Sequence, residues 1–87
     1  MIESSQLEKI ALVVEKAGLS ETLISSLRNA FPEMHFTYCL DDDIPAGKPV
    51  VSKENFNIYL VDSRGHCSNL TTELSIASGL VLAEIIN

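Results

Sequence analysis

The side chains with the greatest capacity for chemistry are two histidines and two cysteines: His35, Cys39, His66 and Cys67. Imidazole and thiolate are the ligands of tetrahedral zinc sites, and a cysteine beside a histidine can be a nucleophile. Spacing argues against both uses. His35 and Cys39 share one face of an expected strand but lie roughly 13 Å apart at about 3.3 Å per residue, whereas His66 and Cys67 are adjacent and would point to opposite faces. These four residues are therefore metal or thiol candidates, but ordinary partly buried thiols and polar histidines are the interpretation we favour.

Three consecutive carboxylates, Asp41, Asp42 and Asp43, are a second candidate site. They could bind a divalent cation, but they lack the alternating spacing and the closing glutamate of a calcium loop. A solvated acidic loop that meets a basic partner surface is the interpretation we favour. The pair Gly47-Lys48 lacks the other glycine and the following helix of a phosphate-binding loop. The sequence therefore predicts no cofactor.

Length and charge limit the possible functions. Eighty-seven residues predict a single small domain over 1–87, and a hydrophobic content of 46% excludes a disordered chain. The 12 acidic residues outnumber the 6 basic ones, and the net charge of −6 opposes binding to nucleic acid or an anionic membrane. Two cysteines without CxxC spacing, no secretion-signal pattern and no bilayer-length apolar run indicate a cytoplasmic protein with free thiols.

The candidate residues follow two expected helices. Ser5 and Glu8 have the spacing of a capping box at the start of the first helix, and Gly18 suits its C-terminal cap. Ser20 begins the second helix and Pro32 follows its end. The short join predicts an antiparallel or sharply angled pair. The apolar stripes of the two helices are Leu7, Ile10, Ala11, Val14 and Ala17, then Leu23, Ile24 and Leu27.

Alternating side chains predict strands after the helices. Residues 34–40 place Met34, Phe36, Tyr38 and Leu40 on one face, with the candidate His35 and Cys39 on the other. Residues 41–55 contain two prolines and a glycine and are expected to form a loop or exposed arm. Residues 56–60 form a second strand, residues 62–65 a type I turn, and residues 66–70 an antiparallel return strand.

The C-terminal segment is apolar on almost every position from 76 to 86. We expect a helix over 73–86, capped by Thr71 or Thr72, that has more apolar surface than one small sheet can cover. Leu80 and Val81 are then expected in a contact with a partner or a second copy. The predicted fold class is α+β: a helical hairpin, a three-stranded antiparallel meander and a C-terminal helix packed on the sheet, in the order α-α-β-β-β-α.

Three segments carry a resemblance: HFTYC-LDDDIPAGKP, FNIYLVDSRGHC and LTTEL followed by GLVLAE. In these segments the chain is similar to a family of short uncharacterised bacterial proteins encoded among nitrogen-fixation genes. The resemblance spans nearly the whole chain, and the His66-Cys67 turn and residues 79–84 are its most specific parts. It implies an accessory role around nitrogenase assembly, metal-cluster supply or regulation. It brings no catalytic residue.

We therefore expect a small acidic cytoplasmic accessory protein that acts by protein–protein contact or by self-association through the C-terminal helix. The residues expected in the contact are Asp41, Asp42, Asp43, Leu80 and Val81. The alternative is a metal-binding or thiol redox accessory protein that uses Cys39, Cys67, His35 and His66. We expect no enzymatic activity, no nucleic-acid partner and no membrane contact.

Overall fold

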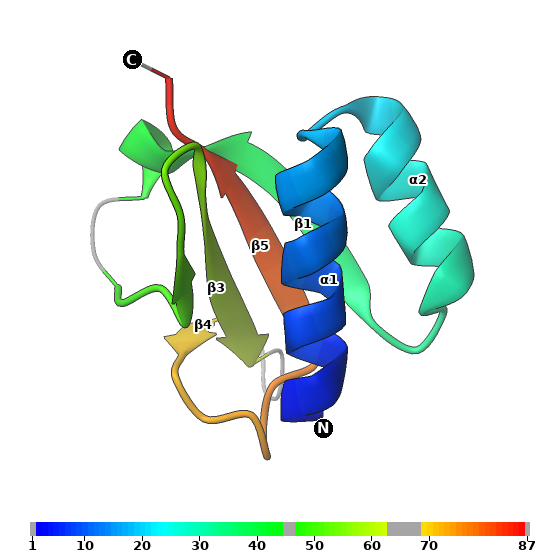
Figure 1. Ribbon diagram of the computed structural model, residues 1–87. Helices are drawn as coiled ribbons and strands as arrows, with labels where there is room; N and C mark the ends of the chain where they lie inside the picture. Colours follow the sequence, from blue (N-terminus) through cyan, green and yellow to red (C-terminus); the bar gives the residue numbers. More distant parts are fainter. Residues whose placement is uncertain (1, 45–46, 63–68, 87) are drawn as a thin grey trace.

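Two helices pack on one face of a mixed sheet, as the computed structural model shows for residues 2–44, 47–62 and 69–86 (Figure 1). The described residues form an α+β fold, as expected, but both of their helices precede the strands. The elements are α1 (Ser4–Ala17), α2 (Glu21–Ala30), β1 (His35–Leu40), the 3-10 turn η1 (Asp41–Asp43), β2 (Val51–Ser52), β3 (Phe56–Asp62), β4 (Asn69–Thr71) and β5 (Gly79–Glu84).

The two helices form where local signals predict them. The Ser20 hydroxyl accepts a hydrogen bond from the Leu23 N–H at 3.1 Å and caps α2 as expected. Gly18 ends α1 with a positive φ of 78°, and its N–H bonds to Val14. The expected cap at Ser5 and Glu8 is wrong by two residues, because α1 begins earlier and the Gln6 side chain accepts from the Glu3 N–H at 3.0 Å.

The expected helix over 73–86 is wrong. The Thr71 hydroxyl does accept from the Glu73 N–H, and the N–H of Ala77 bonds to the Leu74 carbonyl, so a single turn forms. The chain then extends as β5, in which residues 79–83 are all buried and lack polar side chains, and only Glu84 at its end is charged. A short apolar run buried on both sides has no period that separates strand from helix, which explains the error.

The expected antiparallel meander is also wrong, because β5 lies between β1 and β3. It pairs parallel with β1, from His35 opposite Gly79 to Leu40 opposite Glu84, and antiparallel with β3. The second long edge of β3 carries β2 and β4, both antiparallel. The sheet is therefore mixed, and β1 forms one of its outer edges.

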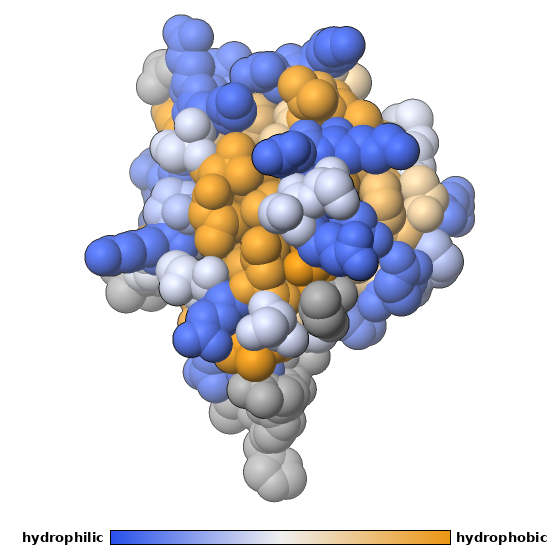
Figure 2. Space-filling model, turned by 60° about the horizontal axis from the view of Figure 1, so that its bottom comes forward, coloured by the Kyte–Doolittle hydropathy of each residue, from blue (hydrophilic) through white to orange (hydrophobic). Residues whose placement is uncertain are grey.

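Apolar side chains cover both faces of β5. Leu80 and Leu82, both fully buried, belong to the main core under the two helices. Val81 and Ala83 belong to a smaller cluster on the opposite face, which also includes Tyr59. At the end of the molecule that lies at the bottom of Figure 1, an apolar band between polar and charged side chains still reaches the surface (Figure 2). The described residues thus do not enclose all of their own apolar groups.

Gly79 makes the close approach of β1 to β5 possible. A Cβ atom at this position would lie 2.6 Å from the His35 carbonyl oxygen and 2.9 Å from the His35 Cβ. We expect Gly79→Ala to lower the free energy of unfolding by about 1–3 kcal/mol, because β1 has to move away from β5. Amide exchange at Thr37 and Cys39, whose N–H groups face β5, should accelerate.

Gly18→Ala is the matched control for this substitution. No atom lies within 4 Å of its added Cβ, so its cost is backbone strain at φ +78°, about 1–2 kcal/mol. Exchange at Thr37 and Cys39 should then change only as much as global stability does. Equal exchange behaviour in the two variants would show that Gly79 does not control the β1–β5 contact.

Candidate functional site

The structure places two of the four metal and thiol candidates. His35 and Cys39 lie on β1, both on the sheet face opposite the helices, with His35 exposed and Cys39 partly buried as a free thiol. His66 and Cys67 lie outside the described residues, so their part in a site stays a prediction. In the described ranges, no group of three or more His, Cys, Asp or Glu side chains is arranged to hold a metal ion.

The surroundings of Cys39 disfavour its thiolate. Burial raises the pKa of the Cys39 thiol, and the nearby carboxylates of Asp43 and Asp41 raise it further. A nucleophilic or metal-binding cysteine needs the opposite, a thiolate stabilised by positive charge. Cys39 therefore stays protonated at neutral pH and acts as a small apolar residue in the second cluster.

The three consecutive aspartates separate into different roles. Asp41 Oδ1 accepts hydrogen bonds from Asn57 Nδ2 and from the Tyr59 hydroxyl, both at 2.9 Å. Burial, followed by the bond to Asp41, raises the pKa of the Tyr59 hydroxyl, which keeps it a donor. Asp42 and Asp43 are exposed. Asp41 therefore holds η1 against β3, while its two neighbours are free for contact with a partner.

The apolar contact candidates lie inside the fold. Leu80 has no exposed surface and Val81 is 9% exposed, because both belong to the central strand β5. The reason for expecting them in an interface was a helix with too much apolar surface, and that helix is absent. The argument for self-association through this segment is thereby removed.

The outer edge of β1 has backbone N–H and C=O groups that do not bond to the other described strands of the sheet. The His35 N–H donates to the Ser78 carbonyl, so the backbone N–H and C=O of His35 face β5. Because these groups alternate along a strand, those of Thr37 and Cys39 also face β5, and those of Phe36 and Tyr38 face outward. Arg28 Nη2 donates to the outward Phe36 carbonyl at 3.0 Å. Within the described part of the chain, the N–H and C=O of Tyr38 have no hydrogen-bond partner.

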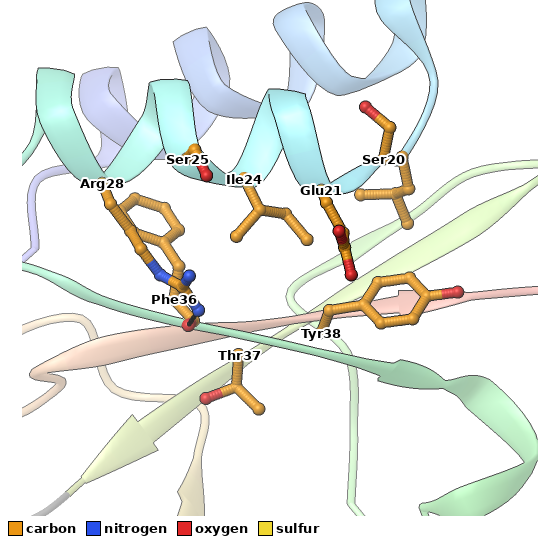
Figure 3. A pocket seen from close by; sticks show the side chains of 9 residues that line it. Ser20, Glu21, Ile24, Ser25, Arg28, Phe36, Thr37 and Tyr38 are labelled. Carbon is orange, nitrogen blue, oxygen red and sulfur yellow. Dashed lines mark hydrogen bonds between the residues drawn. The ribbon is translucent and has the colours of Figure 1, made fainter.

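A groove of about 710 Å³ runs between this edge and α2 (Figure 3). Ile24 of α2 points into it, with Arg28 at the Phe36 end and Glu21 at the Tyr38 end. The Tyr38 hydroxyl donates to Glu84, which raises the pKa of Tyr38 and fixes the ring at the mouth of the groove. The groove therefore combines outward-facing backbone N–H and C=O groups of β1, a small apolar floor, and opposite charges at its two ends, from Arg28 and Glu21.

Sequence reasoning missed this groove. Arg28 and Glu21 look like the solvated face of an amphipathic helix, and charged residues there are common. Their importance depends on β1 being an edge strand beside α2, which follows from the position of β5. No local sequence signal marks β1 as an edge strand, because strand order is set by contacts between residues that are distant in the sequence.

We expect Asp41→Ala to lower the free energy of unfolding by about 1.5–3 kcal/mol, because Asn57 and Tyr59 lose a charged acceptor in a partly buried position. Urea denaturation measures the change. Asp42→Ala is the matched control and should stay within about 0.5 kcal/mol of the parent, since Asp42 is exposed. Equal costs for both substitutions would contradict the structural role of Asp41.

Comparison with known proteins finds a family but no characterised relative. No curated protein and no solved structure matches the chain. The profile of one family matches residues 8–85, from within α1 to just beyond β5. The match therefore covers nearly the whole chain, including the groove between α2 and β1. The chain belongs to DUF6129, a family of unknown function.

Proposed function

We propose that this protein is a small cytoplasmic accessory protein that acts by protein–protein contact and binds its partner along the outer edge of β1. The supporting observation is the backbone N–H and C=O of Tyr38, which bond to none of the described residues and lie beside the groove under α2. An extended segment that adds to an open edge gains backbone hydrogen bonds and places its side chains in neighbouring pockets. The open edge of β1 and the groove beside it support this mode of binding.

The two edges of the sheet differ in a way that favours β1 for docking. On the far side, β2 has two residues and β4 has three, and short strands are a common protection against pairing with other chains. β1 has six residues, and its Tyr38 and Leu40 side chains are 43% and 37% exposed. Among the described residues, only Arg28 bonds to the outward backbone of this strand, at the Phe36 carbonyl.

Charge narrows the class of partner. The net charge of −6 opposes nucleic acid and anionic membrane, as the sequence indicates. Exposed Asp42 and Asp43 lie in the turn after β1, so a partner that is basic next to its docking segment would be attracted to this end. No helix in the described ranges is long and apolar enough to cross a membrane. A protein partner with local positive charge fits these observations best.

Tyr38→Pro tests the docking edge. Proline removes the outward N–H of Tyr38 and leaves the bonds to β5 intact, because those come from Thr37 and Cys39. In a pull-down from the native host, we expect a discrete partner that is retained by the parent protein and lost with Tyr38→Pro. Tyr38→Val is the matched control, since it loses the ring and hydroxyl but keeps the N–H, and it should retain the partner.

Circular dichroism and thermal melting establish that Tyr38→Pro is folded before its binding is compared. A partner that binds folded Tyr38→Pro as well as the parent would place the contact elsewhere. A partner lost with both substitutions would assign the contact to the Tyr38 side chain rather than to the backbone edge. Either result contradicts the docking mode proposed here.

We also propose a bacterial nitrogen-fixation setting for this accessory role. Its support is the resemblance of three segments, which include β1, β3 and β5, to proteins encoded among nitrogen-fixation genes. Deletion of the gene is expected to slow growth on dinitrogen as the nitrogen source, while growth on ammonium stays unchanged. Equal growth of the deletion strain and its parent on dinitrogen would contradict this setting.

A further inference from the structure

We infer that the partner segment is an extended peptide antiparallel to β1, with a basic side chain facing Glu21 and, further along its chain, an acidic side chain facing Arg28. This inference rests on the proposed function and adds the chemistry of the partner. It depends on the charges at the two ends of the groove, on the free backbone of Tyr38 and on the position of α2.

The two ends of the groove carry opposite and available charges. Arg28 and Glu21 form no ion pair with another described residue, and the guanidinium has donors beyond the one used on the Phe36 carbonyl. They lie seven positions apart on the helix, or roughly 10 Å at 1.5 Å per residue. This distance corresponds to about three residues of an extended strand at 3.3 Å each. Residues three positions apart point to opposite faces, so the two peptide side chains that reach Glu21 and Arg28 are two or four positions apart.

The middle of the groove selects an extended chain with a modest apolar side chain. Ile24 and Phe36 form its floor, and each is only 5% exposed. The volume of about 710 Å³ lies within the range of roughly 300–1,000 Å³ that is usual for ligand clefts. Because the floor is small, binding depends on the backbone bonds to Tyr38 and on the two charged contacts.

The order of the charges along the peptide follows from strand direction. Antiparallel pairing is slightly more stable per residue than parallel pairing, so we assign the peptide that direction. A peptide antiparallel to β1 reaches Tyr38 and Glu21 first, then Phe36 and Arg28. Its basic residue therefore precedes its acidic residue.

A second copy of β1 is a poorer occupant than a peptide. In a symmetric pair of β1 strands, the two-fold axis is perpendicular to the sheet and passes between them, so both copies of α2 lie on the same face. Helix α2 stands on the open side of β1 (Figure 1), so we expect the two copies of α2 to compete for the space above the paired strands. A single extended segment meets no such obstacle.

Selection from a phage-displayed library of random dodecapeptides tests the inference. On the parent protein, we expect enrichment of peptides in which a basic residue precedes an acidic one by two or four positions. On the variant Glu21→Lys, Arg28→Glu, the enriched order should reverse. A synthetic peptide selected on the parent should bind this variant about tenfold more weakly, since two exposed ion pairs are replaced by two repulsions.

The neutral variant Glu21→Gln, Arg28→Gln covers the case in which the charge-exchanged protein does not fold, and on it the enriched peptides should show no charge order.

Enrichment on the parent without charge order, or an order that does not follow the exchange, overturns the inference. If those peptides still fail to bind Tyr38→Pro, docking at the edge stands and only the partner chemistry is wrong. Peptides that bind Tyr38→Pro unchanged overturn the inference and also the proposed docking edge. A dimer in sedimentation that Tyr38→Pro dissociates would make a second copy the occupant and overturn the inference.

Discussion

The structure depends on burying β5 from all sides. Its edges are bonded to β1 and β3, and its faces are covered by two separate apolar clusters. Burial of apolar surface is the main favourable term in folding, and Leu80, Leu82 and Ala83 have none of their surface exposed. Gly79 permits this arrangement because a side chain at that position would collide with His35 of β1.

The candidate site is a consequence of that central strand. With β5 between β1 and β3, β1 pairs with one described strand only and forms an edge. The short connection from α2 to β1 then places Arg28 and Glu21 along that edge. The groove, its open backbone groups and its opposite charges therefore arise from how the core is built.

The second face of the sheet is organised by one carboxylate. Asp41 accepts two hydrogen bonds from β3 side chains and so holds the segment after β1 against the smaller apolar cluster. Bonds to a charged acceptor are stronger than neutral ones, about 1.5–3 kcal/mol each. The neighbouring Asp42 and Asp43 are exposed, which divides an apparently uniform acidic run into one structural residue and two surface charges.

The sequence by itself determined the elements whose signals are local. The Ser20 cap and the Gly18 terminus follow from hydrogen bonds within a few residues, and β1 and β3 are visible because their side chains alternate. β5 lacked such a signal, since a strand covered on both faces is as uniformly apolar as a buried helix. Strand order, the edge position of β1 and the role of Asp41 were decided by the tertiary structure alone, because each depends on contacts between residues far apart in the chain.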